Sequence, residues 1–157
     1  MTSRRWPVVL LALVCVGCGV RPSGAISGNP APTGPVNGVT LFLVRSGELA
    51  PTLRTTATQL TPVQAVTLLA AGPTEQERQQ GLHTEVPSNL APANVTADAS
   101  GITLDVALDP NSLSTMAVDQ LVCTTQSAIA DQNLPFPAST GFFIAGAGRT
   151  IKADRCP

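Results

Sequence analysis

The sequence predicts a single α+β domain in which a mixed sheet is packed by two helices in two layers. Short runs of β-branched and apolar residues alternate with two segments of helical periodicity, in the order β-α-β-β-α-β. Residues typical of helix caps begin both helical segments, and Gly, Pro, Ser and Asn separate the runs. The folded part is predicted to be residues 38–157, a usual size for one domain.

The first predicted strand is residues 39–44, an almost continuously apolar run that ends at Ser46-Gly47. This character indicates a largely buried strand. Residues 49–56 predict a second, weaker strand, which Pro51 is expected to interrupt because proline lacks a backbone N–H.

The clearest helix start is Thr61–Gln64, with Thr as N-cap, Pro at the first helical position and Gln at the third. Gly72-Pro73 ends this helix, and Gly72 is expected to adopt the left-handed conformation. Thr74–Glu77 repeats the capping pattern over a short helical turn that closes at Gly81. Residues 82–92 predict an irregular connection.

The second half of the chain predicts a hairpin, a long helix and a closing pair of strands. Alternating residues flank Ser100-Gly101, which is a hairpin signal. The predicted elements are strands 95–98 and 102–106, helix 116–132, and strands 141–145 and 150–153 around a turn at Gly146-Ala147-Gly148.

The N-terminus has the pattern of an export signal. Arg4 and Arg5 precede an apolar stretch, Trp6–Val16, and a small Gly17. Eleven apolar residues are too few for a membrane span, which needs roughly 20. The sequence therefore predicts a signal peptide of residues 1–17 and a protein that leaves the cytoplasm.

The segment Cys15-Val16-Gly17-Cys18 resembles the lipobox of bacterial lipoproteins, which places the acylated cysteine directly after the small residue. The family usually has Leu where this chain has Cys15. The resemblance implies palmitate-type acylation of Cys18 and a lipid anchor on the outer face of the bacterial cytoplasmic membrane. An ordinary secretory leader is the alternative.

Residues 18–37 join the predicted anchor to the domain. Four Gly and four Pro in residues 19–37 leave no periodic apolar pattern, which predicts a flexible linker. As a coil it spans roughly 25 Å on average.

Charge and aromatic content exclude several kinds of partner. Residues 1–17 hold two of the nine basic residues and none of the ten acidic ones, so the chain from Cys18 carries a net charge of −3 with His83 neutral. A nucleic-acid binder would need clustered Lys and Arg to neutralise phosphates. The chain has no Tyr, and its single Trp lies in the leader, which disfavours stacking on sugars or bases.

Two cysteines follow Cys18, and both belong to the predicted domain. In an oxidising exterior such a pair predicts a disulfide between Cys123 and Cys156, with two buried thiols as the alternative.

Residues 68–90 resemble the hallmark of GerMN domains, which are known from sporulation and spore-germination proteins. The pattern is an aliphatic helix end, Gly-Pro-Thr, Glu, Gly-Leu-x-Thr and a Pro. Residues 39–54 are similar to its opening strands, and Val118–Thr124 is similar to its second helix. The matching residues are Gly72, Pro73, Thr74, Glu77, Gly81, Leu82, Thr84 and Pro87.

The resemblance covers about residues 38–153, and small actinobacterial lipoproteins are similar in layout. It implies an α+β domain that acts as an assembly or docking module at the cell envelope, without known chemistry.

The residues point to no catalytic, metal or cofactor site. His83 is the only histidine, and its expected place is a surface loop. Gly146-Ala147-Gly148 precedes β-favouring residues, so a hairpin turn is expected instead of a phosphate loop.

The function predicted from the sequence is a membrane-anchored, non-enzymatic module that binds an envelope protein and no nucleic acid. Two alternatives stay open: a carrier of small molecules or peptides, which a large apolar pocket would favour, and a hydrolase of unfamiliar design.

Overall fold

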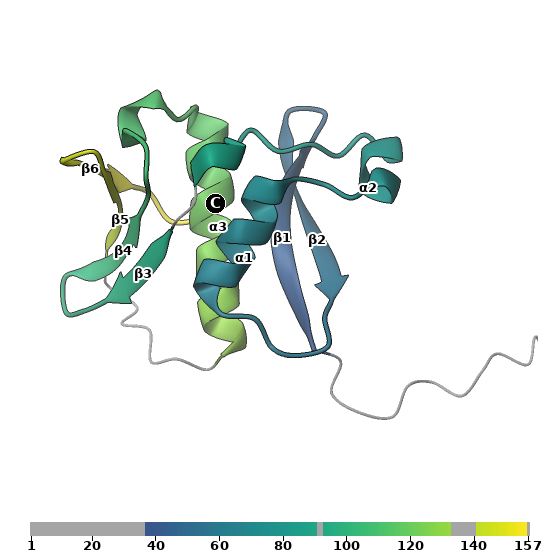
Figure 1. Ribbon diagram of the computed structural model, residues 1–157, viewed down its shortest axis with the longest axis horizontal. Helices are drawn as coiled ribbons and strands as arrows, with labels where there is room; N and C mark the ends of the chain where they lie inside the picture. Colours follow the sequence, from purple (N-terminus) through teal and green to yellow (C-terminus); the bar gives the residue numbers. More distant parts are fainter. Residues whose placement is uncertain (1–36, 91–92, 133–140, 157) are drawn as a thin grey trace, which may run out of the picture. The chain divides into compact units, whose positions relative to one another are not determined.

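The computed structural model describes residues 37–90, 93–132 and 141–156 (Figure 1). All of them belong to one compact unit, Gly34–Pro157. The predicted signal peptide, Cys18 and residues 19–36 of the predicted linker lie outside the described residues.

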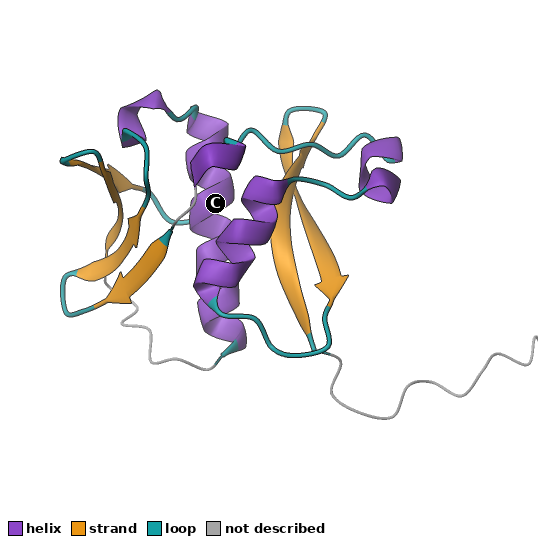
Figure 2. Ribbon diagram, in the orientation of Figure 1, coloured by secondary structure: helices purple, strands orange, loops and turns teal. Residues whose placement is uncertain are grey.

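Strands and helices alternate through the described domain (Figure 2). The elements in chain order are β1 (Gly38–Arg45), β2 (Glu48–Thr55), α1 (Pro62–Ala71), α2 (Glu75–Gln79), β3 (Asn94–Ala97), β4 (Gly101–Asp105), α3 (Thr115–Asp131), β5 (Gly141–Gly146) and β6 (Arg149–Ala153), with short 3₁₀ turns at Ser88–Leu90 and Pro110–Ser112.

The described residues form two sheets. An antiparallel hairpin, β1–β2, lies on one side of α1 and α3, and a four-stranded sheet of order β3-β4-β5-β6 lies on the other side (Figure 1). The larger sheet is mixed, because β4 pairs with β5 in parallel while its other pairings are antiparallel. The predicted α+β class with a mixed sheet is confirmed.

The prediction of one sheet in two layers is wrong, because the helices lie between two sheets. The physical reason is α3, in which six consecutive residues, Gln120–Thr125, are buried. A helix with one apolar stripe needs a single layer to cover it, whereas a helix buried on all sides needs cover on both faces.

The core joins both sheets through the helices. Its main cluster includes Leu43 from β1, Leu69 from α1, Leu121 from α3 and Phe142 from β5. A smaller cluster of Val39, Leu41, Ala65 and Ala128 closes the end of the hairpin against α1 and α3.

Pro51 does not interrupt β2, contrary to the sequence-based expectation. It lies opposite Phe42 in the register. The Phe42 N–H donates to Thr124 Oγ1 at 3.0 Å, and its C=O accepts from Gln120 Nε2 at 2.7 Å. Both Phe42 groups therefore face α3 and not β2, so the missing N–H of Pro51 removes no bond between the strands. Proline on the free edge of β2 also discourages pairing with another chain.

Two of the three hairpins in the described ranges, β1–β2 and β5–β6, are closed by two-residue turns in which both residues have positive φ. Ser46 and Gly47 have φ of 54° and 81°, and Ala147 and Gly148 have 48° and 73°. These values are typical of the type I′ turn, whose twist matches that of the strands. The predicted turn at residues 146–148 is confirmed.

Replacing Ala147 by Gly is expected to raise the free energy of unfolding by about 0.5–1 kcal/mol. A left-handed backbone costs a residue with a Cβ about 1–2 kcal/mol, and glycine avoids this cost. Part of the gain is lost because glycine has more conformational freedom in the unfolded chain. Urea unfolding measures the difference. Ala99→Gly is the matched control, because Ala99 is exposed in a turn without positive φ and its replacement should destabilise. Equal effects at both positions would contradict the assignment of strain to Ala147.

Candidate functional site

Gly72 ends α1 in a conformation that differs from the one expected. Its φ of 84° is positive, as predicted, but its ψ is −174°. This region is essentially restricted to glycine. The following Pro73 explains it, since a proline ring disfavours helical ψ in the residue before it and favours extended ψ.

The first half of the motif, residues 72–77, anchors α2 to β2 through an ion pair between Glu77 and Arg54. Arg54 Nε donates to Glu77 Oε1 at 2.9 Å, its Nη2 lies 2.5 Å from Glu77 Oε2, and Nη2 also donates to the Gly72 C=O at 2.9 Å. Glu77 and Thr74 complete a capping box, with the Thr74 N–H 2.6 Å from Glu77 Oε2. The Arg54 and Glu77 side chains are only 16% and 11% exposed.

These contacts stabilise the ionised form of Glu77. Hydrogen bonding to Arg54 is the main cause, helped by the Thr74 N–H, and together they outweigh burial and lower the pKa of Glu77 from 4.5 to about 2. The carboxylate is therefore charged at neutral pH and is occupied by partners within the domain.

The second half of the motif is also structural. Gly81 has φ of 78°, and the buried Leu82 donates its N–H to the Glu77 C=O at 3.0 Å. Thr84 Oγ1 accepts from the Val86 N–H at 3.1 Å, and the Pro87 C=O accepts from the Leu90 N–H at 3.1 Å.

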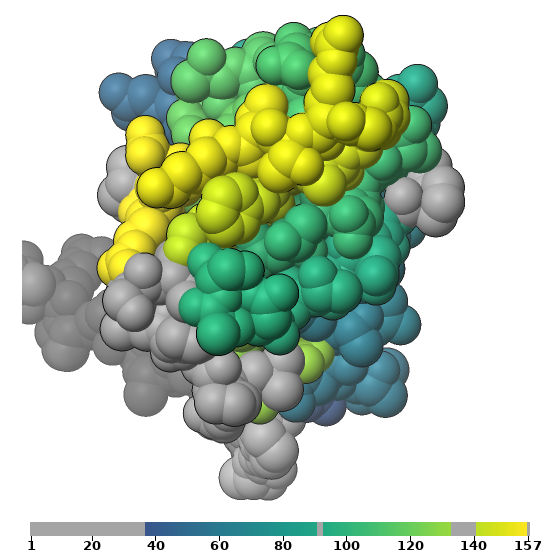
Figure 3. Space-filling view, turned by 90° about the vertical axis from the view of Figure 1, so that its left-hand side faces the viewer, coloured from purple at the N-terminus to yellow at the C-terminus, as the bar shows by residue number. Residues whose placement is uncertain are grey.

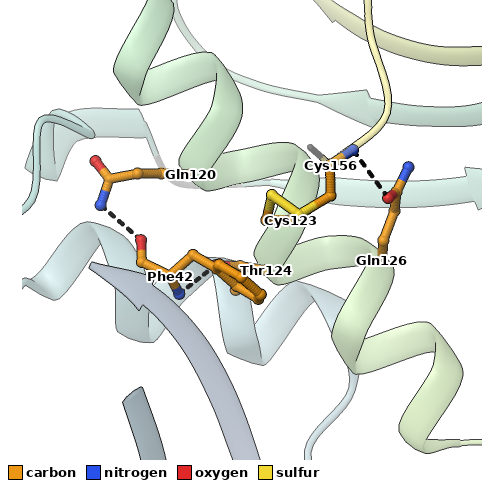
Figure 4. The surroundings of a disulfide bond; sticks show 6 residues. All are labelled: Phe42, Gln120, Cys123, Thr124, Gln126 and Cys156. Atoms are coloured by element: carbon orange, nitrogen blue, oxygen red, sulfur yellow. Dashed lines mark hydrogen bonds between the residues drawn. A yellow bond between two sulfur atoms is a disulfide. The ribbon is translucent and has the colours of Figure 1, made fainter. Parts of the chain in front are cut away.

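Gln120 connects three parts of the fold. It is fully buried on α3, where its Nε2 donates to the Phe42 C=O at 2.7 Å and its Oε1 accepts from the Glu85 N–H at 2.8 Å. Figure 4 shows the Gln120 side chain and Thr124, one turn further along α3, directed at the backbone of Phe42. Within the described ranges β1 pairs with no strand other than β2, and these two side chains supply the partners of the Phe42 backbone groups.

Replacing Gln120 by Met is expected to destabilise the domain by about 2–3 kcal/mol, because the variant leaves the Phe42 C=O and the Glu85 N–H without their buried partner. Thermal and urea unfolding measure the loss. Gln126→Met is the matched control on the same helix, since Gln126 is half-buried and the one bond of its side chain among the described residues is a 3.4 Å bond accepted from the Cys156 N–H. If both variants lost the same stability, the network would not be the cause.

The predicted disulfide is present in the structure. Cys123 on α3 and Cys156, which follows β6, are bonded, with their Cα atoms 4.8 Å apart (Figure 4). The bond holds the end of β6 against the middle of α3.

His83 lies at the surface. Its side chain is exposed, and its backbone forms a two-way bridge with Val44, with N–O distances of 2.8 and 3.0 Å. Among the described residues, no group of three or more His, Cys, Asp or Glu side chains could hold a metal ion. None of the helices in the described ranges is both long and apolar enough to cross a membrane.

A groove of about 470 Å³ lies along the outer side of α1, where the β2–α1 connection passes beside the helix. We call it the α1 groove. Its lining residues are Thr56, Ala57, Leu60, Gln64, Thr67 and Leu68. Ligand pockets commonly have volumes of roughly 300–1,000 Å³.

The four-stranded sheet turns its other face outward (Figure 3). The register places Thr96, Thr103, Phe143 and Lys152 side by side across its four strands, and we call this row the outer sheet face. Thr96 and Lys152 are exposed, and Thr103 and Phe143 are half-buried. Sheets with antiparallel pairs commonly leave one face to solvent, and in the described ranges this mixed sheet does so at Thr96 and Lys152.

Phe143 packs on two glycines of this face. A Cβ on Gly101 or on Gly141 would lie 3.0 Å from the Phe143 ring. The Phe143 ring therefore packs over both glycines, and a side chain at either glycine position would displace the ring.

Sequence reasoning missed the residues that hold the motif in place. Arg54 lies 23 positions before Glu77, and nothing local marks it as the partner. Gln120 and Thr124 carried a weak signal, because two polar residues four positions apart lie on a largely apolar helix and share one face.

Comparison with protein-family models finds no match, and comparison with curated proteins finds none. Among solved structures, the chain is similar to one described as the tandem GerMN domains of the sporulation protein GerM from Bacillus subtilis. The TM-score is 0.53 and the sequence identity 17%, over 79% of this chain and 43% of that one. The chain thus spans less than half the length of that structure. The likeness shows that the domain has a GerMN-like α+β fold.

Proposed function

We propose that the chain is a membrane-anchored extracytoplasmic lipoprotein and that its GerMN-like domain is a non-enzymatic module that binds an envelope protein. The predicted leader with Cys18 supports the anchor, and the likeness to a sporulation protein supports a role in sporulation or in the envelope. The motif supports a scaffold, because its polar groups are bonded within the domain: Glu77 to Arg54 on β2, the Thr74 N–H to Glu77, and Thr84 to the Val86 N–H.

The observation that carries the binding role is the outer sheet face. It presents hydroxyl, aromatic and cationic side chains in one row, and within the described ranges no helix or strand packs over the exposed Thr96 and Lys152. A partner of complementary shape would bury Phe143 further at the centre of the contact. The exposed Thr96 and Lys152 would form hydrogen bonds with that partner at the rim.

The anchor is tested by replacing Cys18 with Ala in the full chain. Labelled palmitate should enter the wild type and a Cys15→Ala control but not Cys18→Ala, and intact mass should show cleavage after Gly17. Equal label in wild type and Cys18→Ala would reject the lipoprotein assignment.

The binding role is tested by photocrosslinking in native membranes. A photoreactive amino acid at Thr103 or Lys152 should give discrete adducts with a protein, and the same group at the exposed Gln79 on α2 should not. Equal adducts from all three positions, or none from the sheet, would contradict docking at the outer sheet face.

A carrier function is the second candidate, and the α1 groove is the observation that favours it. Saturable binding of a small molecule by the full chain, without protein adducts from the outer sheet face, would replace the docking function with the carrier function.

A further inference from the structure

We propose that the α1 groove receives an acyl chain of a membrane lipid. This inference rests on the proposed anchoring of the domain at the membrane, and it assigns to the groove a ligand class that the docking role does not require.

The groove is apolar because its polar side chains are bonded to nearby backbone. Thr56 Oγ1 donates to the Thr58 C=O at 2.6 Å, and Thr67 Oγ1 donates to the Val63 C=O at 2.9 Å. Gln64 Oε1 accepts from the Thr61 N–H at 2.8 Å as part of the helix cap, and the Gln64 side chain is exposed, so water can reach its Nε2 amide. An apolar ligand can therefore enter without leaving the two hydroxyl groups or Gln64 Oε1 unpaired.

The same arrangement favours an acyl chain over a peptide. A peptide laid in the groove would bring backbone N–H and C=O groups that need partners once they leave water. Both hydroxyl groups of the lining, on Thr56 and Thr67, already donate within the domain, and Gln64 Oε1 already accepts, so the lining offers few partners to a peptide backbone. An acyl chain needs only the apolar surface of Ala57, Leu60 and Leu68.

The groove wall is held in place before any ligand binds. Gln132 Nε2 donates to the Leu60 C=O at 2.7 Å, and Gln59 Nε2 donates to the Asp131 C=O. Both bonds tie the β2–α1 connection to the end of α3. A preformed site loses less conformational freedom on binding than one that must be ordered.

The chain outside the described domain ends at the rim of this groove. Asn37 is the first described residue, its Nδ2 donates to the Ala57 C=O at 3.3 Å, and its C=O accepts from the Thr56 N–H at 3.0 Å. Thr56 and Ala57 both line the groove. The predicted tether thus attaches beside the groove, and holding the domain at the membrane raises the effective concentration of lipid that the groove meets.

The test uses the mature chain of residues 19–157 with a hexahistidine tag at its N-terminus, held on vesicles that contain nickel-chelating lipid. The vesicles are phosphatidylglycerol and phosphatidylethanolamine with a trace of phosphatidylcholine whose acyl chain carries a diazirine. The tag replaces acylated Cys18 as the anchor. The experiment therefore measures lipid binding in the groove whether or not Cys18 is acylated in the natural protein.

After illumination, label should concentrate on peptides containing residues 56–68. Ala57→Trp, which fills the groove from its exposed rim, should lower that label about tenfold, the change produced by roughly 1.4 kcal/mol of lost binding. Ala71→Trp is the matched control, because Ala71 is exposed on α1 outside the lining, and its label should stay at the wild-type level. Circular dichroism checks that both variants fold.

Two results would overturn the proposal. The first is an equal loss of label on residues 56–68 in Ala57→Trp and Ala71→Trp. That result would show that lipid contacts this surface of the domain without binding in the α1 groove. The second is label spread over other faces of the domain, which would show unspecific association with the vesicle.

Discussion

Replacing Glu77 by Ala is expected to lower the free energy of unfolding by about 3–5 kcal/mol, which is typical when one partner of a largely buried ion pair is removed. The variant leaves the Arg54 guanidinium, which is only 16% exposed, with the Gly72 C=O as its remaining described acceptor. It also removes the side chain that accepts from the Thr74 N–H, so the cap of α2 is weakened.

Glu75→Ala is the matched control, because Glu75 lies on the same helix and pairs with Arg78 at 2.6 Å, with the two side chains 70% and 56% exposed. Exposed pairs contribute about 0–1 kcal/mol. Urea unfolding at neutral pH measures both variants. If Glu77→Ala were as mild as Glu75→Ala, the Arg54–Glu77 pair would not anchor the motif.

The same pair predicts an acid dependence of stability. The pKa of Glu77 falls from 4.5 to about 2 on folding, so its contribution is fully present above about pH 4.5 and is lost as the pH falls towards 2. A shift of this size corresponds to roughly 3 kcal/mol. Comparing wild type with Glu77→Gln isolates this loss from that of other carboxylates, such as Asp98, whose pKa hydrogen bonds from Ser100 also lower. Parallel curves for the two proteins between pH 5 and pH 2 would contradict the assignment.

Removing the disulfide by replacing Cys123 and Cys156 with Ser is expected to destabilise the domain by about 3–4 kcal/mol. The bond closes a loop with a sequence separation of 33, and restricting a loop of that length in the unfolded chain gives an effect of this size. The bond also holds the C-terminal end against α3, so hydrogen exchange in β6 should rise more than in the β1–β2 hairpin.

Unfolding of the wild type with and without reductant provides the comparison. Reduced wild type lacks only the covalent link and should show most of the loss. The double variant should be as unstable or slightly more so, because it also places a hydroxyl group at the buried position 123. A variant as stable as the oxidised wild type would show that the C-terminal end is held by packing alone.

The local elements of the fold were predictable because their signals lie within a few residues of one another. Thr61 with Gln64, and Thr74 with Glu77, form the capping boxes that the sequence predicted. The turn at Ala147-Gly148 was predictable for the same reason, since residues next to it in the chain define it.

The conformation of Gly72 shows where a local signal has two solutions. Glycine after a helix predicts positive φ, and the structure has it. Its ψ depends on Pro73 and on the direction in which the chain must leave α1, which the usual helix-end pattern does not include.

The sequence by itself determined the α+β class, the helices and the turns, because each depends on a local pattern. It offered Cys123 and Cys156 as a pair but left two buried thiols as the alternative, and the structure bonds them. Only the tertiary structure decided that two sheets enclose the helices, that Arg54 neutralises Glu77 and that Gln120 completes the edge of β1. These contacts join residues 23 to 78 positions apart. Helical or strand periodicity records which face of an element is buried, but it does not record which distant residue will meet that face.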